Sequence, residues 1–187
     1  MTNSSISKFD QYALIALLAK RVGGADRRLG KKAIQKNVHL IQELGGVDAG
    51  YRFSFYTYGP YSSGVAGDLD VVAALGGAKI TYNSSDNYYL IEPGAETDHL
   101  IQKGRTFIER NRAAIERVLE TFGGRLAKDL ELVSTIAYLR RHAPAGKFEN
   151  NKKLAAHVKA LKPKYTDKEI AKAIEEVRGF LTAEEAA

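Results

Sequence analysis

Apolar residues recur at helical spacing in the first part of the chain. The pattern predicts one helix over about residues 7–22 and a second over about 29–44, in which Ile34, Val38 and Ile41 follow one another at steps of three and four. A Gly-Gly doublet follows each segment, as expected where a helix ends in a conformation that glycine adopts readily. Two consecutive amphipathic helices therefore open the fold.

β-Structure is predicted in two places farther along the chain. Aromatic and polar residues alternate over 51–56, which is the period of a strand, and this strand leads into a turn that ends at Pro60. Proline is well suited to the first position of a helix, and the apolar spacing that follows predicts a helix over 61–75. Two β-prone runs, 79–82 and 88–91, flank five turn-forming residues and predict a β-hairpin.

The second half of the chain is predicted to be helical. A helix over 98–122 carries apolar residues at steps of seven, a seam that would pack on the preceding unit or pair two subunits as a homodimer. Shorter helices are expected over 126–141 and 151–161. Thr166 and Glu169 have the spacing of a capping box, which opens the last helix.

This order of elements predicts the fold class. Helix, helix, strand, helix and hairpin within about 90 residues is the order expected of a winged-helix-like unit, with the hairpin as its wing. We predict a mainly α fold with a small β component. A winged-helix-like domain over residues 1–96 is followed by a helical extension over 97–187, which packs on it or continues it as one domain.

Composition narrows the class of protein. The chain has 187 residues, of which 44% are hydrophobic and 27% charged, as in a globular protein with a buried core. It has no cysteine, which excludes disulfides, thiol nucleophiles and cysteine-ligated metals and favours a cytoplasmic location. The longest uninterrupted apolar run, residues 12–19, is far shorter than the ~20 residues that cross a bilayer, so we expect no membrane partner.

The net charge of +6 and a pI near 9.4 suit an acidic partner such as nucleic acid. Residues 51–98 are acidic, whereas the flanking segments are basic. Candidate nucleic-acid contacts are the clustered basic residues Arg27, Arg28, Lys31, Lys32 and Lys36. The alternative is that this cluster is only the solvated start of a helix. The predicted helix that would enter a DNA groove, 61–75, contains no Lys or Arg and carries Asp68 and Asp70, which phosphates repel.

Motifs of catalysis are missing from the sequence. The four histidines fall on different predicted elements without metal-ligand spacing, and neither a P-loop nor a G-x-G-x-x-G motif is present. His39 is expected to be a partly buried packing residue. The run 59–64 contains two serines but lacks the G-x-S-x-G spacing of a nucleophile elbow. We predict a protein that is not an enzyme and uses neither a metal nor a cofactor.

Aromatic residues are concentrated in one short segment, with six rings between residues 51 and 61. Three of them are expected to fill the core, and the others either pack locally or form a partner-binding patch, because tyrosine offers contact area at a low entropy cost. The candidate partner-binding residues are Tyr56, Tyr58, Gly59, Pro60, Tyr61 and Ser62.

Residues 31–36 and 51–62 resemble the K-x-L-Q-K and Y-x-F-x-x-Y-G-P-Y-S patterns of the uncharacterised YwgA-like proteins, with Ile34 where leucine is more usual. Further similarity over 130–136 and 161–173 extends the resemblance to roughly residues 8–180. More distantly, the first part is similar to the Panacea domain of toxin–antitoxin systems and proteolytic adaptors. The resemblance implies a prokaryotic intracellular, winged-helix-like protein that acts by binding, and it supplies no catalytic residues.

The sequence thus leads to two functional hypotheses. The first is a non-enzymatic interaction module that presents its tyrosine-rich surface to a protein partner, in the toxin–antitoxin or defence setting that the resemblance implies. The alternative is a DNA-binding transcriptional regulator that uses the basic helix residues or the wing. Steep dependence of affinity on salt would be the signature of the second hypothesis.

Overall fold

Helices make up most of the chain, and strands in the described residues form two separate antiparallel hairpins, which confirms a mainly α fold with a small β component. The computed structural model describes residues 6–23, 29–84, 87–144, 147–148 and 150–185. The first elements are α1 (Lys8–Val22), α2 (Lys31–Glu43), β1 (Ser54–Tyr56), β2 (Gly59–Tyr61), α3 (Ser63–Ala74), β3 (Ala78–Asn83) and β4 (Tyr88–Pro93). They are followed by α4 (Thr97–Lys103), α5 (Arg105–Arg110), α6 (Arg112–Val118), the π-helical turn η1 (Leu119–Gly123), α7 (Ala127–His142), α8 (Asn151–Leu161) and α9 (Asp167–Glu185).

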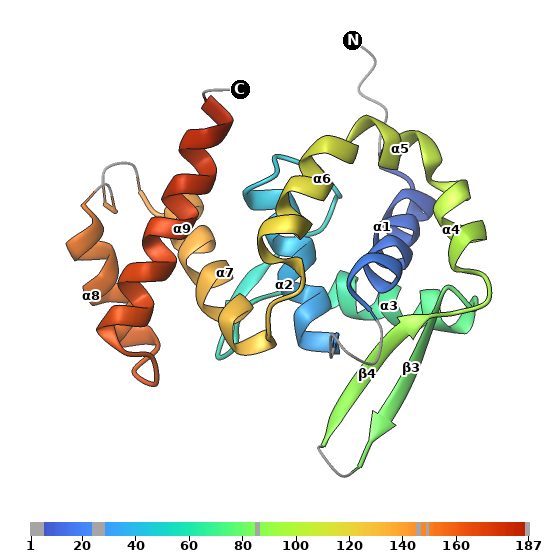
Figure 1. The fold of residues 1–187 in the computed structure, drawn as a ribbon, viewed down its shortest axis with the longest axis horizontal. Coiled ribbons are helices and arrows are strands. Elements are labelled where there is room, and N and C mark those ends of the chain that lie inside the picture. Colours follow the sequence, from blue (N-terminus) through green and yellow to red (C-terminus); the bar gives the residue numbers. More distant parts are fainter. Residues whose placement is uncertain (1–5, 24–28, 85–86, 145–146, 149, 186–187) are drawn as a thin grey trace.

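Helix α2 lies at the centre of the molecule, between α1 and α3 on one side and α7 on the other (Figure 1). Residues 33–41 are all buried, so this helix has no solvent-facing side over more than two turns. Four of those buried residues are polar: Gln35, Lys36, Asn37 and His39. Buried polar groups are normally hydrogen-bonded, as Gln35 and Lys36 are, whereas the side-chain polar atoms of Asn37 and His39 have no partner among the described residues.

The first hairpin differs from the sequence prediction. Only Ser54–Tyr56 of the predicted strand is a strand, and Pro60 lies in β2, paired with Phe55, instead of opening a helix. The prediction of a helix from Tyr61 onward is therefore wrong by two residues. Gly59 has a φ of +80°, which lets the chain turn back immediately, and the helix begins only after Ser62, whose side chain caps it.

The second hairpin confirms the prediction for residues 79–91. Strands β3 and β4 pair in register from Ala78 opposite Pro93 to Asn83 opposite Tyr88, and the hairpin projects from the helical body (Figure 1). It is joined to the body at its base, where the Ile91 amide donates to the Leu29 carbonyl oxygen at 2.8 Å.

The prediction of a single long helix over 98–122 is wrong. The segment is divided into α4, α5, α6 and η1, with breaks at Gly104 and Asn111. Gly104 packs so tightly on α1 that a Cβ atom there would lie 2.5 Å from the Cβ of Ala13. The chain bends around α1 at this point, and Ile108 and Ile115 of the predicted seam are buried in the chain's own core.

The predicted positions of the last helices are confirmed. α7 packs against α2, and α9 packs against both α7 and α8. The capping box is present, because the Thr166 hydroxyl accepts from the Glu169 amide at 3.2 Å and the Glu169 carboxylate accepts from the Thr166 amide at 2.7 Å. Within the described residues, no helix has the length and apolar composition that crossing a bilayer would require.

Candidate functional site

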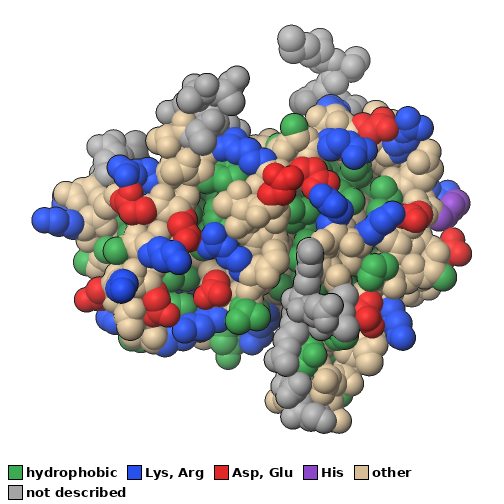
Figure 2. Space-filling view, in the orientation of Figure 1, with side chains coloured by type: hydrophobic (Ala, Val, Ile, Leu, Met, Phe, Trp, Pro, Cys, Tyr) green, Lys and Arg blue, Asp and Glu red, His purple; other side chains and the backbone are tan. Residues whose placement is uncertain are grey.

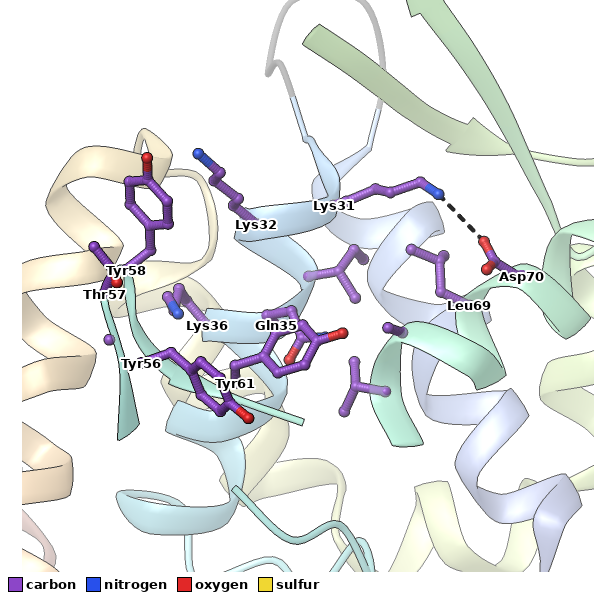
Figure 3. A pocket seen from close by; sticks show the side chains of 14 residues that line it. Lys31, Lys32, Gln35, Lys36, Tyr56, Thr57, Tyr58, Tyr61, Leu69 and Asp70 are labelled. Atoms are coloured by element: carbon purple, nitrogen blue, oxygen red, sulfur yellow. Dashed lines mark hydrogen bonds and ion pairs between the residues drawn. The ribbon is translucent and has the colours of Figure 1, made fainter. Parts of the chain in front are cut away.

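A cavity of about 530 Å³ opens between α2, the β1–β2 hairpin and α3 (Figure 3). Its apolar floor is formed by Ile34, Val65, Ala66 and Leu69. Tyrosines of the hairpin stand on one side, and lysines of α2 lie along the upper edge. The remaining lining residues are Lys31, Lys32, Gln35, Lys36, Tyr56, Thr57, Tyr58, Gly59, Tyr61 and Asp70.

The cavity unites two sets of residues that the sequence analysis treated as rival sites. Lys31, Lys32 and Lys36 came from the basic cluster, and four lining residues came from the aromatic candidates: Tyr56, Tyr58, Gly59 and Tyr61. Pro60 and Ser62 are buried behind the cavity wall, so their backbone atoms support the hairpin. Arg27 and Arg28 lie outside the described residues.

Helix α2 holds the hairpin through two side chains. The Gln35 amide group forms two hydrogen bonds with the backbone of Ser62: its Nε2 donates to the carbonyl oxygen at 2.9 Å and its Oε1 accepts from the N–H at 3.0 Å. The next residue of the helix, Lys36, donates through its Nζ to the Pro60 carbonyl oxygen at 2.5 Å. Backbone groups that the short hairpin leaves unpaired are thus satisfied by the helix beneath it.

The C-terminal half holds the same hairpin from behind. Lys162 Nζ donates to the carbonyl oxygen of Thr57, in the turn, and also to Glu131 Oε1 at 2.8 Å. Lys164 Nζ donates to the other oxygen, Glu131 Oε2, at 2.8 Å. Burial alone would raise the pKa of Glu131, but the hydrogen bonds from the two lysines lower it below its usual value. Glu131 is therefore a carboxylate whose two oxygens are both occupied.

The tyrosines on the hairpin face outward. Tyr56, Tyr58 and Tyr61 are 60%, 54% and 41% exposed, whereas Tyr51 is buried. Tyr56 and Tyr61 meet edge to face with ring centroids 5.6 Å apart. The Lys32 ammonium lies 4.0 Å from the centre of the Tyr58 ring, a cation–π contact that orients the tyrosine. Of the three rings expected to fill the core, Tyr51 is buried, whereas Phe53 and Phe55 are only partly buried.

Acidic residues of α3 have separate partners. Asp68 is buried, and its carboxylate accepts from both Lys8 Nζ at 3.0 Å and the Tyr51 hydroxyl at 2.9 Å. Asp70 lies at the edge of the cavity, where its Oδ1 is 3.2 Å from Lys31 Nζ (Figure 3). The Lys31–Asp70 pair joins α2 to α3 across the mouth of the cavity.

Lys36 is the one lysine of α2 that is buried, with 4% of its surface exposed. Burial lowers its pKa to about 8; Glu131 opposes this shift, while Lys162 and Lys32 add to it. One turn farther, His39 is wholly buried, more than expected, with its ring edge against Phe53 at a centroid distance of 4.9 Å. Neither ring nitrogen has a hydrogen-bond partner among the described residues, and burial lowers the His39 pKa to about 3.

Sequence reasoning missed Gln35, Glu131 and Lys162. Glu131 and Lys162 are 31 residues apart in sequence and meet the hairpin only because α7 packs on α2, for which no local pattern gives a signal. Gln35 lies within residues 31–36, which carry the family resemblance, so its side chain could have been singled out as a polar group on a buried helix. Among the described residues, no three His, Asp or Glu side chains gather as metal ligands would.

The sequence matches no family model, and no curated protein matches it.

Proposed function

We propose that this protein is a non-enzymatic binding module of winged-helix-like arrangement that holds a segment of a partner protein in the cavity between α2, α3 and the β1–β2 hairpin. The observation that carries the proposal is the set of three exposed tyrosines beside an apolar-floored cavity. A volume of about 530 Å³ is within the range of sites that enclose a ligand or an anchoring side chain.

The hairpin is prepared for binding before any partner arrives. Its backbone is fixed by Gln35 and Lys36 from one side and by Lys162 from the other. A site that is already ordered loses little conformational entropy on binding, so more of the contact energy contributes to affinity. Tyr58 and Tyr61 add large amphipathic surfaces, the residue type that dominates binding energy at protein interfaces.

A DNA-binding regulator is less well supported by the same geometry. Of the described lysines in the basic cluster, Lys36 is buried and Lys31 is paired with Asp70. Figure 2 shows Lys and Arg interspersed with Asp and Glu over the visible face, rather than gathered into the basic stripe that tracks a phosphate backbone.

The test is a selection of peptides from a displayed random library on the immobilised protein. Enriched peptides are titrated against the wild type, the double variant Tyr58→Ala/Tyr61→Ala, and Tyr82→Ala as a matched control. Tyr82 is 52% exposed but lies on the other hairpin, so its loss removes a similar surface elsewhere. We expect the double variant to lose at least about tenfold in affinity and the control to bind like the wild type.

Two outcomes would overturn the proposal. One is a library that yields no peptide, or only peptides that bind the double variant equally well. The other is tight binding of a random duplex of about 30 base pairs that weakens steeply between low and moderate salt, measured by fluorescence anisotropy, which would establish the regulator instead.

A further inference from the structure

We propose that the cavity recognises an acidic side chain of the partner segment, an aspartate or glutamate next to an apolar residue, and that the Lys36 ammonium is the group that binds its carboxylate. This inference rests on the proposed function, because it specifies the chemistry of the segment that the cavity holds. The charge in question is that of Lys36, which is buried and lines the cavity.

Lys36 has unused hydrogen-bonding capacity. An ammonium group has three N–H donors, and the described residues give this one a single acceptor, the Pro60 carbonyl oxygen at 2.5 Å. No carboxylate within the described part of the chain lies close enough to form an ion pair with it. A buried cation without a carboxylate is unfavourable, and an anion placed beside it would offset that penalty.

The acidic residues nearest the cavity are already occupied. Glu131 directs one oxygen to Lys162 and the other to Lys164, each at 2.8 Å. Asp70 is 3.2 Å from Lys31 at the cavity mouth. Neither carboxylate can turn to Lys36 without leaving another lysine unpaired, so among the described residues no carboxylate matches Lys36, and we assign the matching anion to the partner.

The remaining lining determines what kind of anion fits. Lys32 lies at the entrance and adds positive potential, which attracts an anion and disfavours a cation, whereas Asp70 balances the charge of Lys31. Below them, the floor of Ile34, Val65 and Leu69 is apolar, and a small, fully hydrated anion would leave this floor in contact with water. A carboxylate on a side chain flanked by an apolar residue satisfies both parts of the cavity.

The pH dependence of binding follows from Lys36. Burial lowers its pKa to about 8; Glu131 on α7 opposes this shift, while Lys162, after α8, and Lys32 add to it. The other titratable groups around it are His39 on α2, and Asp70, Tyr56 and Tyr58, which line the same cavity. A carboxylate binds the protonated form. Affinity should therefore be nearly constant between the range where the ligand carboxyl group ionises, at about pH 4, and about pH 8, and it should fall as Lys36 loses its proton above about pH 8.

The experiment uses small aromatic probes observed by ¹⁹F NMR. 4-Fluorophenylacetate carries a ring and a carboxylate, and 4-fluorophenylacetamide has nearly the same shape without the charge. We expect the acid to bind the full chain at least about tenfold more tightly than the amide, and this difference to disappear in Lys36→Met. Lys20→Met removes a positive charge from α1 that pairs with Asp98 and does not line the cavity, and it should leave the difference unchanged.

If Lys36→Met does not fold, the pH profile of the wild type and the charge-preserving Lys36→Arg variant carry the test. Equal affinity for acid and amide, or affinity for the acid that does not fall above about pH 8, would overturn the inference. Library peptides that require Tyr58 and Tyr61 but contain no Asp or Glu would overturn it while leaving the proposed function intact. Conversely, acid binding through Lys36 without any peptide binding would retain the carboxylate site and overturn a protein segment as its source.

Discussion

Gln35 and Ser62 pair as two strands of a sheet would, although one is a helix side chain and the other a loop backbone. Two hydrogen bonds, at 2.9 and 3.0 Å, join them. Two turns along the same helix, Gln42 repeats the arrangement with the backbone of Tyr51, at 3.0 and 3.1 Å. Segment 51–62, which contains the exposed tyrosines, is therefore attached at both ends to one buried helix.

Loss of the Gln35 amide should destabilise the fold. Gln35→Ala leaves the buried Ser62 N–H without a partner and leaves the Ser62 carbonyl oxygen with the Ala66 N–H alone, at 3.2 Å, so we expect the free energy of unfolding to fall by about 1–3 kcal/mol. Urea denaturation followed by circular dichroism measures this change. Gln102→Ala, at an exposed position on α4, is the control and should change stability by less than about 0.5 kcal/mol. Equal effects of the two substitutions would contradict the assigned role.

Two glycine-to-alanine substitutions should have opposite effects. Gly59 has a φ of +80°, and a Cβ atom there would lie 3.0 Å from Thr135 Oγ1, so Gly59→Ala should destabilise the protein by about 1 kcal/mol or more. Gly67 lies inside α3, where a Cβ atom would meet nothing within 4 Å beyond the helix's own backbone, so Gly67→Ala should stabilise the protein by about 0.5–1 kcal/mol. Thermal and urea unfolding of both variants would show whether the signs differ.

The two lysines that share Glu131 should differ in importance. Lys162 is 4% exposed in its side chain, and Lys162→Met removes the partner of both Glu131 and the Thr57 carbonyl group. We expect a loss of about 3 kcal/mol, at the lower end for a buried pair because Lys164 remains. Lys164 is half-exposed, so Lys164→Met should reduce stability by about 1 kcal/mol or less. Similar losses of stability in the two variants would show that burial of the lysine does not decide how much its ion pair with Glu131 contributes to stability.

Stability should fall in mild acid because of His39. Its pKa is about 3 in the folded protein, against a model-peptide value of 6.5, so the unfolded chain binds the proton more tightly. The stability that the neutral ring contributes is complete above about pH 6.5 and is lost progressively as the pH falls toward about 3. In His39→Leu, the difference in unfolding free energy between about pH 7 and pH 4 should be smaller than in the wild type. An unchanged difference would show that another group causes the acid sensitivity.

The sequence predicted the elements that are set by local spacing. The helices over Lys8–Val22, Ala127–His142 and Asn151–Leu161 follow the predicted bounds closely, and the first and the last of them begin directly after a residue whose side chain caps the helix. The prediction of one helix over 98–122 was wrong, since apolar residues at every seventh position are compatible with one long helix and also with several short helices that bend around a neighbour. What divides it is the contact of Gly104 with Ala13, which no pattern within the segment contains.

A related reason explains why the cavity was not predicted. The sequence patterns indicated the tyrosines and the lysines as two separate surfaces. They line one cavity because Gly59 turns the chain back over α2, whereas helix propensity after Pro60 predicted a chain that moves away. The capping position of Ser62, two residues later than expected, is what leaves Tyr61 on a strand and beside the cavity.

The support that Lys162 gives to the turn at Thr57 also limits how this protein can be divided. A fragment that ends before α7 would retain the tyrosines and the lysines of α2 but lose the groups that hold the hairpin from behind. Transplanting the tyrosine hairpin to another scaffold, or exchanging C-terminal halves between related chains, would therefore require that α7 and the residue just after α8 be carried along as part of the same unit.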